Sequence, residues 1–257
     1  MDSKALRVTA VLGTAAGLAL AVVPAASAAQ PHADPHTVSH AVNHHVVSPR
    51  DHVVSHTKSA QQSSNWAGYA ATGSYTAATA TWTVPTVTTS SSDKYSSDWV
   101  GIDGYNNSDL IQLGTEQDSV GGQAEYQAWW EILPAAETPI DSVTISPGDS
   151  ITATIQSNGD GSWTMTLTDN TDGESFSTTQ DYSGPGDSVE YIEEAPEIDG
   201  SIASPAQLSE ADFSDLTANG SDPGLTSSDE IDLVQNGTTY YKPALTGTDS
   251  FTVSDEG

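Results

Sequence analysis

Short runs of alternating polar and apolar residues fill the chain from about residue 60 to its end, and no long segment there repeats its apolar residues every 3.6 positions. A period of two is the pattern of β-strands that bury one face, so this region is predicted to be all-β. Turn sequences at 158–161 (NGDG) and 169–173 (DNTDG) indicate hairpins between antiparallel strands. Many short strands of this kind predict a single β-sandwich or jelly roll.

Strands are expected at 78–84, 98–103, 109–113, 123–133, 150–156, 162–168, 175–182 and 188–194, and more weakly at 230–235, 238–242 and 250–253. Residues 209–215 are expected to form a single helical turn.

The first 28 residues have the features of a secretory signal peptide. Lys4 and Arg7 precede an apolar segment from Val8 to Val23, and Ala-Ser-Ala at 26–28 fits the cleavage site. The apolar segment is short for a membrane span. Residues 1–28 are therefore predicted to direct secretion, and the mature protein is expected to be extracellular and free of the membrane.

Residues 29–60 form a separate block that holds all seven histidines. A His-rich tract can bind metal, can be a disordered linker, or can become cationic as the pH falls through the histidine range near 6.5. Because the block precedes a strongly acidic region, attraction between the two favours a propeptide. Residues 61–257 are then the functional domain.

From Ser59 onward the chain has no histidine, cysteine or arginine, and its only basic side chains are Lys94 and Lys242. All but three of the 35 acidic residues lie here, which gives this region a formal charge of −30. A Ser-His-Asp or Cys-His site, a His- or Cys-ligated zinc site and disulfides are therefore excluded. Carboxyl acid–base chemistry, an oxygen-ligand metal site or no chemistry remain.

The negative charge argues against nucleic acid and anionic membranes as partners. It suits a protein that works at low pH, where protonation of carboxyl groups relieves repulsion, and it also suits a halophilic surface.

The strand expected at 123–133 has two different faces. One face carries Gln123, Glu125, Gln127, Trp129 and Glu131, and the other carries Ala124, Tyr126, Ala128, Trp130 and Ile132. The second face has the composition of a core, whereas the first fits either the lining of a cleft or a solvated outer face. Gln112 likewise points away from its apolar neighbours, so it lies at a site or on an exposed face.

A series of short motifs follows in order along this region. They are Ser64-Asn65-Trp66-Ala67-Gly68, Trp99-Val100-Gly101-Ile102-Asp103-Gly104, Ile111-Gln112-Leu113-Gly114, Tyr126-Gln127-Ala128-Trp129-Trp130-Glu131, Val143-Thr144-Ile145-Ser146-Pro147-Gly148-Asp149 and Glu190-Tyr191-Ile192-Glu193-Glu194. The series resembles the glutamic peptidases, or eqolisins, a family of secreted acid endopeptidases. The resemblance covers roughly residues 62–255, and the ordered set is far more specific than any one motif.

The resemblance implies an antiparallel β-sandwich of two large sheets, of jelly-roll or concanavalin-like type, and a catalytic Gln–Glu pair. The family's glutamine falls on Gln112 and its glutamate on Glu194, although Glu190 opens the same motif and the choice depends on motif register. The resemblance also places five residues around the cleft as substrate-binding or supporting groups: Trp66, Trp99, Asp103, Trp129 and Glu131.

The implied mechanism hydrolyses peptide bonds in polypeptide substrates, with no cofactor and no metal, in a monomeric enzyme. Glu194 takes a proton from water and later passes it to the leaving amine, while the Gln112 amide stabilises the oxyanion. A carboxylate base suits acid conditions, in which histidine is already protonated.

The chain departs from the family pattern in places. The absence of cysteine indicates a bacterial-type member, and Glu193 replaces an apolar residue beside the predicted base, whose pKa a like charge would raise. Two other functions remain open: a carbohydrate-binding β-sandwich or glycosidase that uses Gln127, Trp129 and Glu131, and a calcium-binding domain that uses the acidic loop 169–174.

Overall fold

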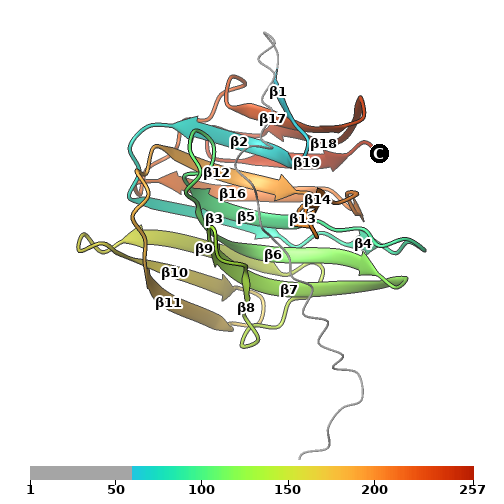
Figure 1. Cartoon of the computed structure of the whole chain (residues 1–257), viewed down its shortest axis with the longest axis horizontal. Helices are drawn as coiled ribbons and strands as arrows, with labels where there is room; N and C mark the ends of the chain where they lie inside the picture. Colours follow the sequence, from blue (N-terminus) through green and yellow to red (C-terminus); the bar gives the residue numbers. More distant parts are fainter. Residues whose placement is uncertain (1–59) are drawn as a thin grey trace, which may run out of the picture. The chain divides into compact units, whose positions relative to one another are not determined.

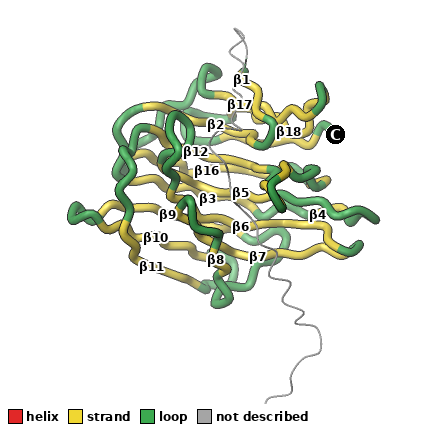
Figure 2. Tube along the Cα trace, viewed as in Figure 1, coloured by secondary structure: helices red, strands yellow, loops and turns green. Residues whose placement is uncertain are grey.

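The computed structural model describes residues 60–257. The predicted signal peptide at 1–28 and almost all of the His-rich block at 29–60 lie outside the described residues. Within residues 60–257 the chain forms strands joined by turns and loops, with no helix (Figure 2). The all-β prediction is therefore confirmed.

The strands, most of which are labelled in Figure 1, are β1 Gln61–Ser63, β2 Trp66–Thr72, β3 Ala77–Thr83, β4 Val87–Thr88, β5 Ser97–Ile102, β6 Ile111–Val120, β7 Gln123–Ile132, β8 Thr138–Pro139, β9 Ser150–Ser157, β10 Ser162–Asp169, β11 Ser175–Asp181, β12 Ser188–Glu194, β13 Glu197–Ile198, β14 Ser201–Ile202, β15 Gln207–Leu208, β16 Ala211–Ala218, β17 Glu230–Gln235, β18 Thr238–Leu245 and β19 Phe251–Asp255.

Most of these strands belong to one hydrogen-bonded ladder, in the order β11-β10-β9-β3-β16-β19-β18-β17-β2-β12-β5-β6-β7-β8. Neighbours in this order pair antiparallel, while β1 pairs parallel with β17. The ladder folds over at the β17–β18 hairpin, so that β3 and β9 contact β5 without pairing with it. The result is a sandwich with β17 to β8 in one layer and β11 to β18 in the other.

Alternation along each strand fills the space between the layers. In β3 and β9 the apolar side chains face inward, including Trp82 and Ile151, which are at most 1% exposed. The outward threonines pair across the strands, with Thr81 Oγ1 2.8 Å from Thr152 Oγ1. Such cross-strand pairs fix the register of an outer face that has no core to pack against.

The predicted helical turn at 209–215 is wrong, because the structure has strand β16, Ala211–Ala218, in its place. Its buried apolar residues, Ala211, Phe213, Leu216 and Ala218, are spaced two, three and two positions apart. A β-bulge between Ser214 and Thr217, with Asp215 at φ 51°, supplies the extra residue. The bulge interrupts the period of two, and this made the segment look non-β in the sequence.

Other expected strands agree with the structure more closely. Strands β12 and β17 have the expected bounds, and both predicted hairpin turns connect β9–β10 and β10–β11. The expectation missed β2 and stopped β6 at Leu113, seven residues before its end at Val120. Five of the seven β2 residues are buried, so no alternation marks this strand.

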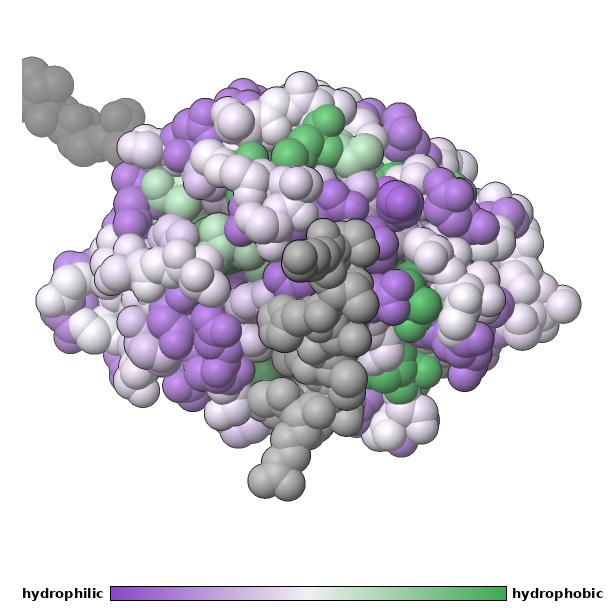
Figure 3. Space-filling view, turned by 90° about the horizontal axis from the view of Figure 1, so that it is seen from above, coloured by the Kyte–Doolittle hydropathy of each residue, from purple (hydrophilic) through white to green (hydrophobic). Residues whose placement is uncertain are grey.

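Figure 3 shows a face on which hydrophilic and near-neutral residues predominate, with small hydrophobic patches between them. In the part of the chain that the structure describes, no helix has the length and apolarity needed to cross a membrane.

Candidate active site

The predicted catalytic residues share one face of the layer formed by β2, β12, β5, β6 and β7. Alternation directs Trp66, Glu194, Trp99, Gln112 and Glu131 away from the space between the layers. A second apolar cluster, separate from the main core, lies on this face and contains Trp66, Ala70, Trp99, Leu110, Trp129, Ile192 and Ile231. The structure therefore brings six of the seven predicted site residues together; Asp103 is described below.

Glu194 is fully buried and is held by one side chain from β5 and one from the bend before β2. Trp99 Nε1–H donates to Glu194 Oε2 at 2.7 Å, and Asn65 Nδ2–H donates to Oε1 at 3.1 Å. Ser63 Oγ–H in turn donates to Asn65 Oδ1 at 2.9 Å. Burial raises the pKa of Glu194 to about 7, while the hydrogen bonds from Trp99, Asn65 and Trp66 oppose this rise.

Gln112 and Glu131 lie directly opposite each other on β6 and β7. Gln112 Nε2 is 2.6 Å from Glu131 Oε2, and both side chains are fully buried. Burial and the charge of Glu194 raise the pKa of Glu131 to about 9, although the contact with Gln112 lowers it. Glu131 is therefore a neutral acid over the whole acidic and neutral range.

The ladder register by itself would favour Glu190 as the partner of Gln112. Gly101 lies opposite both residues, whereas Glu194 is four positions farther along β12. Electrostatics indicate the opposite choice, because the charge of Glu194 acts on Glu131, while Glu190 interacts with Asp103 and Asp187.

Two glycines make room for the Trp99 indole between these groups. A Cβ on Gly114 would lie 2.1 Å from the carbonyl oxygen of Asp98 and 2.6 Å from Trp99 Cβ. A Cβ on Gly101 would lie 2.7 Å from the Trp99 ring. The indole packs edge-on against Trp66, with ring centroids 5.1 Å apart, and so points its N–H at Glu194.

Asp103 lies at the end of β5 and organises the loops beside the site. Its Oδ1 accepts from Asn107 Nδ2–H and the Asp187 amide, and its Oδ2 accepts from Tyr182 O–H and the Gly186 amide, all at 2.6–2.9 Å. Asp103 is buried and has φ 68°, which Asp tolerates better than most residues. These bonds occupy the carboxylate, so its role in the structure is to anchor loops.

Glu193 points the other way, into the space between the layers, as alternation requires. Its carboxyl group interacts with that of Asp98, whose Oδ2 accepts from Gln117 Nε2–H at 3.0 Å. Burial, followed by the charge of Asp98, raises the pKa of Glu193 well above its usual range. The like charge that acts on Glu194 is that of Glu197 instead.

Sequence reasoning missed two residues of the site. Asn65, which binds Glu194, lies inside the first quoted motif, so its place beside Trp66 was an available signal. Glu137 lies in the loop between β7 and β8. Burial and the charges of Glu116 and Glu131 raise its pKa. No strand pattern or motif marks Glu137 in the sequence.

The acidic loop at 169–174 serves as a hairpin turn. Asp169 Oδ1 accepts from the amides of Thr171 at 2.7 Å and Asp172 at 3.3 Å. Among residues 60–257, no group of three or more His, Cys, Asp or Glu side chains is arranged to hold a metal ion.

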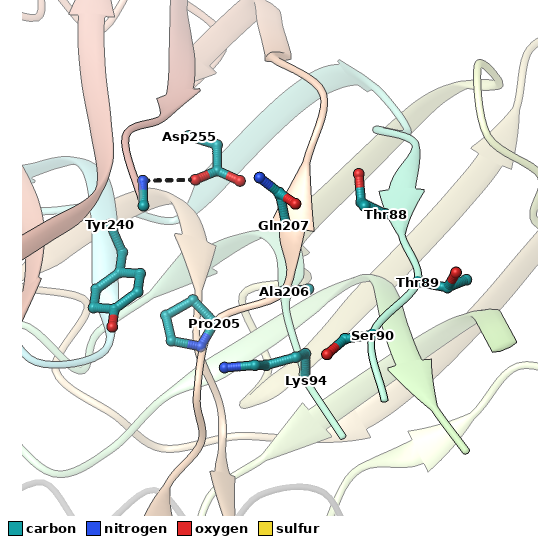
Figure 4. A pocket seen from close by; sticks show the side chains of 10 residues that line it. Thr88, Thr89, Ser90, Lys94, Pro205, Ala206, Gln207, Tyr240 and Asp255 are labelled. Carbon is teal, nitrogen blue, oxygen red and sulfur yellow. Dashed lines mark hydrogen bonds between the residues drawn. The ribbon is translucent and has the colours of Figure 1, made fainter. Parts of the chain in front are cut away.

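A separate cavity of about 290 Å³ lies beside β4, β15 and the end of β19, where Lys94 and Asp255 face it from different segments (Figure 4). None of the predicted site residues lines it.

The sequence is similar to those of two known peptidases. The chain is 31% identical to aspergillopepsin-2 from Aspergillus niger over 225 residues, which cover 77% of this chain and 79% of that protein. It is 32% identical to scytalidopepsin B from Scytalidium lignicola over 174 residues, covering 65% of this chain and 58% of the relative.

Solved structures show the same architecture. Scytalido-glutamic peptidase with a transition state analog inhibitor matches with a TM-score of 0.64 and 27% identity, over 75% of this chain and 98% of that one. Aspergilloglutamic peptidase from Aspergillus niger matches with a TM-score of 0.56 and 29% identity, over 63% of this chain and 99% of that one. These matches confirm the predicted β-sandwich.

A model of the Peptidase A4 family matches residues 64–255, a range that begins one residue before Asn65 and ends at the last residue of β19. It therefore spans all seven predicted site residues. With its sandwich fold, the carboxyl and amide groups on one face of a sheet and two relatives above 30% identity, the chain belongs to the Peptidase A4 family of glutamic peptidases and is a peptide hydrolase.

Proposed function

We propose that the protein is an endopeptidase in which Gln112 and Glu194 form the catalytic pair. One observation carries this proposal. Both groups lie on the same face of one sheet. Glu131 contacts Gln112, and the charge of Glu194 raises the pKa of Glu131. Trp66, Trp99 and Trp129 supply the apolar surroundings of the pair, and Asp103 supports the loops beside it.

The reaction begins when the Glu194 carboxylate takes a proton from water as the water oxygen attacks the scissile carbonyl carbon. The carbonyl electrons move onto its oxygen, and the Gln112 amide donates a hydrogen bond to the resulting oxyanion. Collapse of the intermediate breaks the C–N bond, and Glu194 returns its proton to the leaving nitrogen. The products are a carboxylic acid and an amine, and Glu194 is again a carboxylate.

The pH range follows from two opposing requirements. The water-activating step needs ionised Glu194, and the ionised fraction falls about tenfold per pH unit below its pKa of about 7. Protonation of the amine and relief of the −30 charge both favour acid. Together these effects predict a pH optimum on the acid side of 7.

Digestion of a denatured protein substrate tests the pair directly. Gln112→Ala should lose about a hundredfold or more in kcat, because one oxyanion donor is worth roughly 10²–10³. Glu194→Gln should lose nearly all activity. Glu190→Gln is the matched control, since Glu190 lies on the same strand and face and is also buried. Equal peptide release by wild type, Gln112→Ala and Glu194→Gln would refute the proposal.

Export and maturation are further parts of the proposal. The signal features at 1–28 support secretion, and the His-rich block at 29–60 has the charge complementarity expected of a propeptide removed on acidification. A chain that begins at Ser59 should be active without acid pretreatment, whereas the longer precursor should need it. Identical pH–activity profiles for the two would show that the block has no such role. The mature enzyme should sediment as a monomer.

A further inference from the structure

The contact between Gln112 and Glu131 is short for an amide donor. Gln112 Nε2 lies 2.6 Å from Glu131 Oε2. Hydrogen bonds from N–H to oxygen usually measure about 2.7–3.2 Å, whereas bonds from O–H to oxygen measure about 2.5–3.0 Å. The distance is therefore more typical of a carboxylic acid that donates its proton to an oxygen.

The atoms of this pair that have no hydrogen-bond partner are also unsuited to the catalytic role proposed for Gln112. Among residues 60–257, neither Gln112 Oε1 nor Glu131 Oε1 has a hydrogen-bond partner, although both side chains are fully buried. The Gln112 nitrogen, which must donate to the oxyanion, is turned to Glu131, and the atom of Gln112 without a partner is its carbonyl oxygen. A carbonyl oxygen cannot donate to the oxyanion that forms during peptide hydrolysis.

The charges around Glu131 require it to keep its proton. Glu194 from β12 and Glu137 from the β7–β8 loop both interact with it, and both are acids. The domain's two lysines, Lys94 and Lys242, are not among the groups that act on it. A neutral carboxyl group in a buried site needs an acceptor for its O–H.

We propose that Glu131 is a positioning residue whose O–H donates to Gln112 Oε1 and thereby turns the Gln112 NH₂ toward the substrate. This arrangement needs only a half-turn of the terminal amide, a torsion that is broad and roughly two-fold. It places an acceptor opposite the Glu131 proton and leaves a donor for the oxyanion. The inference rests on the proposed role of Gln112 as the oxyanion donor.

Two substitutions at Glu131 separate orientation from packing. Glu131→Gln keeps a donor that can face Gln112 Oε1, whereas Glu131→Leu has a similar size and no donor. Kinetics on a fluorogenic peptide at the pH optimum should show kcat reduced tenfold to a hundredfold for Glu131→Leu, with KM changed less than threefold. Glu131→Gln should stay within about fivefold of wild type. Thermal unfolding would establish that each variant is folded.

The double variant Gln112→Ala/Glu131→Leu makes the test specific. If Glu131 acts through Gln112, the Leu substitution should cost nothing more once Gln112 is absent. A Glu131→Leu loss of the same size in both backgrounds would overturn the inference, as would equal kcat values for Glu131→Leu and Glu131→Gln. Full activity of Gln112→Ala alone would instead overturn the proposed function.

A neutron structure of the wild-type enzyme at acid pH tests the same point without any substitution. A deuteron on Glu131 directed at an oxygen of Gln112 would support the inference. Two deuterons on the Gln112 atom that faces Glu131 would overturn it.

Discussion

The hydrogen bond from Trp99 to Glu194 should set the pH dependence of activity. Trp99→Phe keeps an aromatic ring but removes the N–H that donates to Glu194 Oε2 at 2.7 Å. A hydrogen bond to a charged group contributes about 1.5–3 kcal/mol, and about 1.4 kcal/mol corresponds to one pKa unit. Because the bond favours the carboxylate, its loss should raise the pKa of Glu194 by about one to two units from about 7.

The assay is kcat/KM for a peptide substrate measured across the range in which the protein stays folded. If Glu194 works first as a base, the acidic limb of the profile belongs to it and should move to higher pH. If it works first as an acid, the alkaline limb should move in the same direction. The limb that moves therefore identifies the reactive form. Asn65→Leu removes the longer bond, 3.1 Å, and should cause a smaller shift of the same sign.

Trp163→Phe is the control for the loss of indole volume. Trp163 is buried on β10, packs against Tyr182, and is not among the groups that act on Glu194. The pH profile of kcat/KM for Trp163→Phe should keep both limbs at the pH values of the wild type. Unshifted limbs in Trp99→Phe and Asn65→Leu, or limbs displaced to lower pH, would show that these bonds do not tune the catalytic carboxyl.

Three further predictions concern the framework of the site. Asp103→Ala should lower the free energy of unfolding by about 3 kcal/mol or more in chemical denaturation, because it leaves buried donors without their acceptor. Gly114→Ala should abolish activity or folding, since its Cβ would lie 2.1 Å from the Asp98 carbonyl oxygen, and circular dichroism would separate the two outcomes. Glu193→Gln should flatten the decline in unfolding free energy between about pH 4 and 7. The raised folded-state pKa values of Glu193 and Asp98 stabilise the protein in acid. This stability is lost as the pH rises, by about 1.4 kcal/mol per pH unit for each proton. A melting-temperature series across that range, unchanged by the substitution, would contradict the last prediction.

The alternation of polar and apolar residues was sufficient to predict a strand where the strand buries one face and a polar turn bounds each end. Strand β12 was expected at its observed bounds even though all seven of its residues are buried. Strand β2 was missed, because its small apolar residues pack on both faces. In β16 the bulge at Ser214 shifts the phase by one residue, which a fixed period of two does not allow.

The pairing of Gln112 with Glu131 was within reach of the sequence. Gly121 and Gly122 form a two-residue turn with positive φ, and Val120 pairs with Gln123 across it. Eight residues farther from the turn on each strand, the pairing reaches Gln112 on β6 and Glu131 on β7. The expected end of the strand at 113 hid this register. The interaction between Glu194 and Glu131 instead joins strands that are separated by β5 and β6, which no local pattern specifies.

Carboxyl groups with raised pKa values lie on both faces of β12, and this links the chemistry of the enzyme to its stability. Glu194 faces the site, while Glu193, one residue earlier, forms part of the core with Asp98. No lysine acts on Glu194, Glu193 or Asp98, so protons take the place that basic partners hold in other proteins. A rise in pH that ionises Glu194 also ionises Asp98, whose pKa is likewise about 7. Between about pH 4 and 7, the gain in catalytic base should therefore be accompanied by a loss of folding free energy, which favours activity on the acid side without any separate inhibitory device.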